Sequence, residues 1–138
     1  MKPEFKGKHF ITLDDWDKPQ IERLLEVSKE LKRKFYNNED TTYLKNKTSF
    51  LMFFEQSTRT RNSMEAGIAQ LGGHGNFLDT SGMQISHGES AKDTAKILSS
   101  YGHAIACRNC FWGIGNQYLR SMAENSSVPV MNLQCDLY

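Results

Sequence analysis

The chain has 138 residues, a length typical of a single domain with its own hydrophobic core. Its 17 basic and 16 acidic residues leave a formal net charge of +1, which argues against a large footprint on nucleic acid or on a membrane surface. The odd number of cysteines, three, argues against a disulfide framework. The first twenty residues carry several charged side chains, which argues against a secretory signal peptide. We therefore expect a cytoplasmic protein.

The first predicted element is an amphipathic helix over residues 17–35. Its apolar residues recur at helical spacing on one face, at Ile21, Leu24, Leu25, Leu31 and Phe35. Asp17, followed three residues later by Gln20, is typical of a capping box at the start of a helix. Residues 37–47 are polar and turn-like, so we expect the helix to end before them.

Strands and helices then alternate to the end of the chain. The sequence predicts strands at residues 48–54, 75–79, 103–109 and 128–135. It predicts helices at residues 60–71, 89–102 and 115–126. This alternation is typical of an α/β domain, and we predict a three-layer open parallel sheet of about four strands with helices on both faces. The chain ends just after a predicted strand, where a site residue would be expected, so we expect a longer protein.

A dense group of hydrogen-bond donors joins the first of these strands to the next helix, in the run Ser57-Thr58-Arg59-Thr60-Arg61. The first N–H groups of a helix have no partner within it, and the helix dipole adds positive potential there. The helix start is therefore suited to an anion, above all phosphate. Three hydroxyl groups add donors, and Arg59 can bind two phosphate oxygens at once.

A simpler interpretation is a capped helix whose arginines only face solvent, since serine and threonine are common at helix starts. Two basic residues near a helix N-terminus oppose the dipole, however, and favour a compensating anion. Neither a Walker phosphate loop nor a G-x-G-x-x-G dinucleotide motif occurs in the chain. The sequence therefore predicts a phosphate site of another kind at residues 57–60.

The stretch "FFEQSTRTR" resembles the carbamoyl-phosphate motif F-x-x-x-S-T-R-T-R of the aspartate and ornithine carbamoyltransferases. The stretch "SGMQISHGESAKDTAKILSSY" is similar to a segment of the ornithine-type enzymes that is written S-x-Q-x-x-x-x-E-S-x-x-D-T-x-x-x-L. "CRN" matches their arginine at the end of the third strand, and the first helix is similar to their opening helix. The resemblance implies a carbamoyl-phosphate-binding domain over residues 1–138, with the second, amino-acceptor domain absent from this chain.

The resemblance implies a role for each matching residue. Phosphate would be bound by Ser57, Thr58, Arg59 and Thr60. Arg108 would contact the phosphate and the carbamoyl oxygen, so that catalysis would rest on Arg59, Thr60 and Arg108. Gln84, or its loop, would reach into the site of a neighbouring subunit, because the family forms trimers with shared sites. Glu55 would face the interdomain cleft. Neither a metal nor a cofactor is implied.

Two departures from the family bear on the acceptor. The H-P-x-Q motif of the family normally follows the fourth strand, and the chain ends at "CDLY" just before that place. Gln56 stands where aspartate-type enzymes have proline, and "CRNCFWGIG" differs from the corresponding loops of both types. The acceptor therefore stays open among ornithine, aspartate, an acylated ornithine and other amines.

Three other interpretations have less support. Cys107 and Cys110 form a C-x-x-C pair, but a zinc site needs two further ligands and a thioredoxin-like pair opens a helix, so we expect structural cysteines. Nucleic-acid binding lacks both a basic excess and interleaved aromatic residues. A non-catalytic phosphate-binding or assembly domain of the same fold is the alternative that remains.

Overall fold

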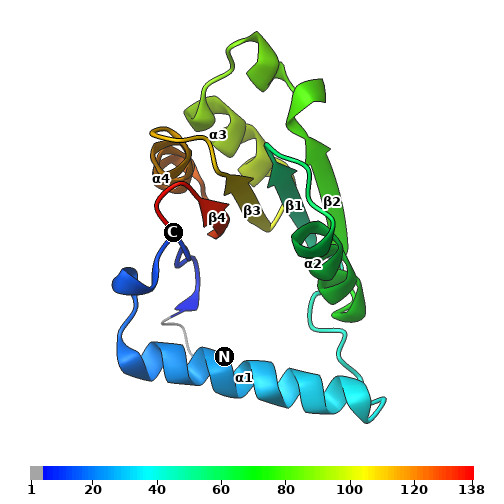
Figure 1. Cartoon of the computed structure of the whole chain (residues 1–138). Coiled ribbons are helices and arrows are strands. Elements are labelled where there is room, and N and C mark those ends of the chain that lie inside the picture. Colours follow the sequence, from blue (N-terminus) through cyan, green and yellow to red (C-terminus); the bar gives the residue numbers. More distant parts are fainter. Residues whose placement is uncertain (1–4) are drawn as a thin grey trace.

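The computed structural model describes residues 5–138, which form a four-stranded parallel sheet flanked by helices (Figure 1). The α-helices are α1 (Lys18–Tyr36), α2 (Arg59–Gln70), α3 (Ala91–Tyr101) and α4 (Gly115–Asn125). The strands are β1 (Thr48–Phe53), β2 (His74–Asp79), β3 (Ala104–Asn109) and β4 (Val130–Cys135). Short 3-10 helices lie at η2 (Leu13–Asp15), η3 (Thr80–Gly82) and η4 (Gln84–His87). No helix among the described residues is long and apolar enough to cross a membrane.

The strand order is β2-β1-β3-β4, and every pairing is parallel. β1 is followed by α2 on one face of the sheet, whereas β3 is followed by α4 on the other face. The chain therefore leaves two adjacent strands, β1 and β3, in opposite directions. Such a switch point opens a crevice at the carboxyl ends of the two strands, which is where ligands bind in open α/β sheets.

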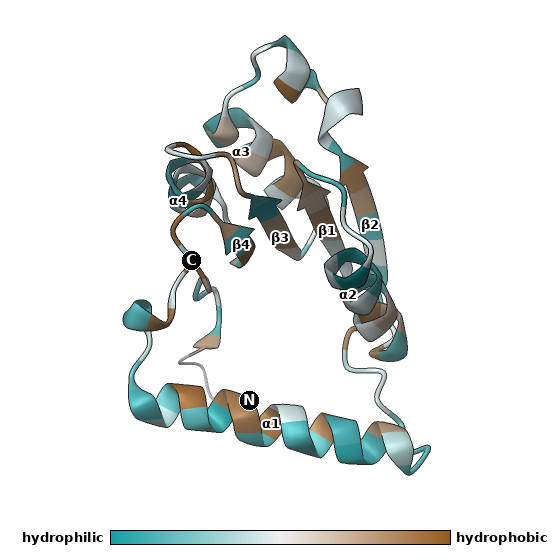
Figure 2. Cartoon of the chain, in the orientation of Figure 1, coloured by the Kyte–Doolittle hydropathy of each residue, from teal (hydrophilic) through white to brown (hydrophobic). Residues whose placement is uncertain are grey.

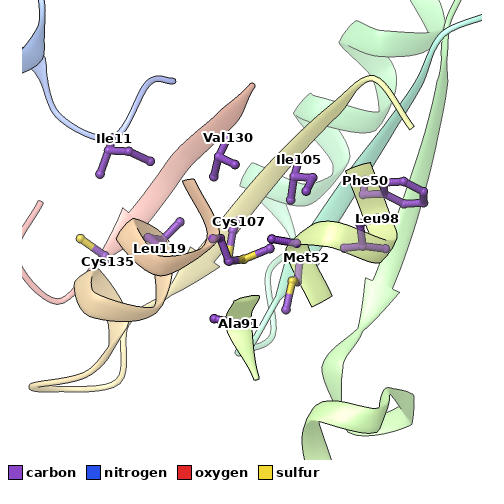
Figure 3. Close-up of a cluster of buried hydrophobic side chains, with 12 residues drawn as sticks. Ile11, Phe50, Met52, Ala91, Leu98, Ile105, Cys107, Leu119, Val130 and Cys135 are labelled. Carbon is purple, nitrogen blue, oxygen red and sulfur yellow. The ribbon is translucent and has the colours of Figure 1, made fainter. Parts of the chain in front are cut away.

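The core has two parts because successive side chains of a strand point to opposite faces of the sheet. Phe50 and Met52 point toward α3 and α4 and belong to the larger cluster, which Figure 3 shows with Ile105 and Leu119. Leu51 of β1 points the other way and packs with Ile68 of α2. This alternation leaves nearly the whole of β1 buried, which explains its continuous apolar sequence.

Helix α1 lies apart from the sheet in Figure 1, and none of its residues is buried. Its predicted capping box is present, because Asp17 Oδ1 accepts the Gln20 N–H and Gln20 Oε1 accepts the Asp17 N–H. Its apolar residues appear as brown bands along the helix in Figure 2. The helix is therefore stabilised by its capping box and by its own side-chain pairs, rather than by burial of side chains within this domain.

The predicted fold class is confirmed, and the element bounds agree with the prediction to within two residues at each end. Two features were not predicted. Phe10 forms an isolated parallel bridge with Met131, so the N-terminal segment extends the sheet beyond β4. The connection between β2 and α3 contains the two 3-10 helices η3 and η4.

Candidate functional site

The loop between β1 and α2 presents backbone donors at the switch point. Ser57 Oγ accepts a hydrogen bond from the Arg61 N–H at 3.3 Å. Within residues 5–138, the N–H groups of Thr58, Arg59 and Thr60 donate to no protein acceptor. Thr58, the residue before the helix, makes no side-chain cap. Three adjacent donors at a helix start, with the helix dipole behind them, form the geometry that binds an oxyanion.

The two arginines of this loop have different surroundings. Arg61 stacks on Phe77, with the guanidinium carbon 3.4 Å from the ring centroid, and its Nε lies 3.6 Å from Glu65 Oε1. Arg59 is exposed, and no ion pair or hydrogen bond to its side chain occurs in the described part of the chain. Their positions near the helix start predict a compensating anion for both charges. The structure instead gives Arg61 protein partners and leaves Arg59 available to a ligand.

Arg108 lies on β3 directly beside the end of β1, in register with Phe53. Its carbonyl accepts the Phe54 N–H at 3.1 Å, which holds the start of the donor loop against β3. The Nε of Arg108 is buried and has no hydrogen-bond partner among the described residues. A buried donor without a partner costs free energy unless a ligand or water satisfies it. The sheet thus brings Arg108 to the same crevice edge as the β1–α2 loop.

Glu55, in the loop after β1, contacts the loop that follows β3. Its Oε1 accepts the Cys110 N–H at 2.7 Å, while its Oε2 is buried and has no partner within residues 5–138. The carboxylate therefore ties the loop after β1 to the loop after β3. Whether the same side chain also faces a second domain stays a prediction.

A cavity of about 500 Å³ adjoins the donor loop at the ends of β1 and β2. Its lining comes from the loop, from Arg61 of α2 and from Phe77, Asp79 and Ser81 at the end of β2. Ser81 donates two hydrogen bonds to Asp79 Oδ1, and they hold the pKa of the Asp79 carboxyl below its ordinary value. A fixed carboxylate thus sits near Arg61 on the far side of the loop from Arg108.

Gln84 lies on η4 in the long connection between β2 and α3, which projects beyond the sheet in Figure 1. The side chain is exposed and does not line the cavity beside the donor loop. Its carbonyl accepts the Glu89 N–H at 3.1 Å, and Glu89 in turn accepts the hydroxyl of buried Thr94. The connection is therefore anchored at its α3 end and presents Gln84 to the outside.

The three cysteines lie on or directly after strands β3 and β4. All three are free, and Cys107 and Cys135 are buried. Burial raises the pKa of the Cys107 thiol well above its ordinary range, so this thiol stays protonated. No group of three or more potential metal ligands occurs among the described residues.

Sequence reasoning missed two residues that shape the site. Asp136, just after β4, accepts the Gly113 N–H at 2.9 Å and the Asn116 N–H at 2.7 Å, so it caps α4 from a neighbouring strand. Asn109, almost fully buried at the end of β3, accepts the Phe111 N–H. An aspartate one residue after a predicted strand is a weak signal, because the capped helix lies 20 residues earlier in the chain.

Together, the parallel sheet, its switch point and the convergent donors define a class of protein: an α/β domain with a helix-start anion site between two adjacent strands. Residues 8–138 match the family model described as the carbamoyl-phosphate-binding domain of aspartate/ornithine carbamoyltransferase. The chain belongs to this family, as the sequence resemblance predicted.

Individual relatives agree with this assignment. An ornithine carbamoyltransferase of Anoxybacillus flavithermus is 42% identical over 129 residues, which is 94% of this chain and 40% of the relative. The solved ornithine carbamoyltransferase of Pyrococcus furiosus has a TM-score of 0.87 and 32% identity, over 94% of this chain and 40% of that one. The chain thus spans about 40% of the length of these relatives.

The fold extends to the aspartate-type enzymes. The aspartate transcarbamoylase of Trypanosoma cruzi, solved in complex with carbamoyl phosphate and aspartate, has a TM-score of 0.83 at 24% identity, over 95% of this chain and 40% of that one. This likeness concerns the fold alone.

Proposed function

We propose that this chain is the carbamoyl-phosphate-binding part, over residues 1–138, of a carbamoyltransferase whose acceptor-binding part it does not include. The observation that carries the proposal is the row of three N–H groups at residues 58–60 that have no acceptor within residues 5–138, together with the exposed Arg59 side chain. The family is described as carbamoyl-phosphate-binding. Ser57 and the hydroxyls of Thr58 and Thr60 add to the phosphate-binding set.

The proposed reaction is the transfer of the carbamoyl group to an acceptor amine, with release of phosphate. An acceptor amine attacks the carbonyl carbon of carbamoyl phosphate, a carbon–nitrogen bond forms and the carbonyl oxygen gains negative charge. The bond from that carbon to the phosphate oxygen then breaks, and the amine proton passes to the departing phosphate. Arg59 stabilises the departing phosphate. The Thr60 hydroxyl and the buried Nε–H group of Arg108 stabilise the negative charge on the carbonyl oxygen. This chemistry relies on position and electrostatics, and residues 5–138 supply its anion half.

We propose a cytoplasmic homotrimer as the working assembly. The connection that carries Gln84 supports this part of the proposal, because it projects beyond the sheet and the Gln84 side chain is exposed, with no hydrogen-bond partner among the described residues. In a trimer, Gln84 would bind the ligand of a neighbouring subunit, and Glu55 would face the cleft between the two domains of its own subunit. Sedimentation that finds only monomers at all concentrations would count against this role of Gln84.

Phosphate binding is the direct test of the proposed site. We expect inorganic phosphate and carbamoyl phosphate to shift the amide NMR signals of Thr58, Arg59 and Thr60. Arg59→Lys keeps the charge but loses the two-pronged hydrogen bond, so it should weaken binding by about tenfold, or about 1.4 kcal/mol. Arg23→Lys, on exposed α1, is the matched control and should bind as the wild type does. Unchanged amide signals at saturating phosphate would rule the site out.

A further inference from the structure

The carboxylate of Glu55 carries a buried oxygen atom that no protein group satisfies. Its Oε1 accepts the Cys110 N–H at 2.7 Å, whereas its Oε2 is buried and has no hydrogen-bond partner within residues 5–138. A carboxylate oxygen only accepts hydrogen bonds, so the partner of Oε2 has to be a donor. Burial of such an oxygen without a donor costs free energy, and a ligand that brings a donor removes this cost.

Glu55 also lines the cavity of about 500 Å³ beside the donor loop, together with Ser57 and Thr58 of the proposed phosphate-binding set. The lining contains a second carboxylate, that of Asp79. Asp79 is exposed, and its Oδ1 accepts two hydrogen bonds from Ser81, so it is satisfied by protein and solvent. Of the two carboxylates in this lining, Glu55 is therefore the one whose oxygen depends on a donor from a ligand.

A buried donor without a partner lies at the same edge of the sheet as this acceptor. Arg108 of β3 is in register with Phe53 of β1, and its carbonyl accepts the Phe54 N–H. Glu55 and Cys110 follow two residues after that register pair, and their hydrogen bond ties the two strand ends together. The Nε of Arg108 has no partner in the described part of the chain, where no ion pair joins Arg108 to Glu55. The two strand ends thus present one unpartnered donor and one unpartnered acceptor.

This donor and this acceptor match the two polar groups of a primary amide. The carbamoyl group of carbamoyl phosphate has a carbonyl oxygen, which accepts hydrogen bonds, and an NH2 group on the same carbon, which donates them. Arg108 is proposed above to stabilise the carbonyl oxygen, which leaves the NH2 group to be bound. Acetyl phosphate has the same phosphate and carbonyl groups but a methyl group in place of the NH2 group. Only the carbamoyl compound can therefore satisfy both Arg108 Nε and Glu55 Oε2.

We propose that Glu55 accepts a hydrogen bond from the carbamoyl NH2 group and so selects carbamoyl phosphate over acyl phosphates. This inference rests on the proposed carbamoyl-phosphate site and deepens it. A methyl group against Oε2 leaves the buried carboxylate oxygen without a donor, and a site with an unpaired buried polar group rejects such an analogue more strongly than a difference in size would. The role agrees with the proposed position of Glu55 at the cleft between the domains, because the acceptor amine must reach the carbamoyl carbon from that cleft.

Amide NMR titrations of the 138-residue chain with freshly dissolved carbamoyl phosphate, acetyl phosphate and inorganic phosphate test the inference. The Kd for acetyl phosphate divided by the Kd for carbamoyl phosphate measures the selectivity, and we expect a ratio of about ten or more in the wild type. In Glu55→Gln, the amide oxygen still accepts the Cys110 N–H while the amide NH2 group faces the carbamoyl NH2 group, so the ratio should fall close to one. Glu55→Ala removes both oxygens and should lose the selectivity as well.

Asp79→Asn serves as the control, because it removes one negative charge from the lining of the same cavity and should leave the ratio unchanged. Equal wild-type affinities for carbamoyl and acetyl phosphate would overturn the inference. So would a ratio that persists in both Glu55 variants, or one that falls equally in Asp79→Asn. In each of these cases, shifts of the residue 58–60 amides by inorganic phosphate would leave the proposed phosphate site standing. If none of the three ligands shifts these amides in the wild type, the proposed function fails together with the inference.

Discussion

Arg59 and Arg61 show how the surroundings of a residue separate two side chains that look equivalent in the sequence. They stand two positions apart at the start of one helix, yet Arg61 covers the Phe77 ring and Arg59 has no protein partner in the described part of the chain. Stacking on an aromatic face offsets the unfavourable helix dipole for Arg61. Arg59 remains the cation that the proposed phosphate would compensate.

Gly115, at the start of α4, has no side chain and so allows α4 to approach the end of β3 closely. A Cβ there would lie 2.0 Å from the Asn109 carbonyl oxygen, so Gly115→Ala must push α4 away from β3. We expect a loss of about 1–3 kcal/mol in the free energy of unfolding, measured by urea denaturation. Gly67→Ala is the control, because nothing lies within 4 Å of its Cβ, and it should stabilise α2 by about 0.5–1 kcal/mol. Equal effects of the two substitutions would contradict this packing.

At the scale of elements, the N-terminal segment is attached to β4 by a small set of hydrogen bonds. Phe10 donates its N–H to the Val130 carbonyl, and its own carbonyl accepts the Asn132 N–H. The Nδ1 atom of His9 accepts the Val130 N–H at 3.0 Å. The titratable side chain of His9 thus helps to attach the N-terminal segment to the β4 edge of the sheet.

This attachment should weaken in acid. Burial lowers the pKa of His9 below its ordinary value, so in the range between the two values the unfolded chain binds more protons than the folded one. The stabilisation from neutral His9 is therefore present above its ordinary pKa of about 6.5 and is lost as the pH falls below it. Between pH 7.5 and 5.5, the free energy of unfolding should fall more in the wild type than in His9→Asn, whose side chain accepts a hydrogen bond without titrating. An identical pH dependence in both proteins would contradict this account.

At the scale of the whole molecule, the proposed function assigns the anion donors of residues 5–138 to one of its two reactants, carbamoyl phosphate. Orientation of two reactants can contribute about 7–11 kcal/mol to lowering a barrier, and that contribution requires both to be held. We therefore expect this chain alone to bind carbamoyl phosphate weakly and to transfer no carbamoyl group at an enzymatic rate. Radiolabelled carbamoyl phosphate with ornithine, aspartate and other amines provides the assay. Turnover of about 1 per second or faster would show a complete site within these residues.

The sequence alone determined the order and type of the elements. The apolar runs at β1 and β3, the amphipathic repeat of α1 and the capping pair Asp17 and Gln20 are local patterns, and local patterns are set by residues close together in the chain. The motif at residues 57–61 likewise predicted the family, which the match over residues 8–138 confirmed. The ligand-binding roles of its residues remain predictions.

Only the tertiary structure decided which side chains meet. Contacts such as Glu55 with the Cys110 N–H, Arg61 with Phe77 and Asp136 with the start of α4 join residues 16 to 55 positions apart, and no local pattern encodes them. The strand order β2-β1-β3-β4 placed the loop after β1 beside Arg108 and created the switch point. Sheet order depends on how whole helices pack across both faces. Neither this crevice nor the exposure of Trp112 therefore follows from a local pattern in the sequence.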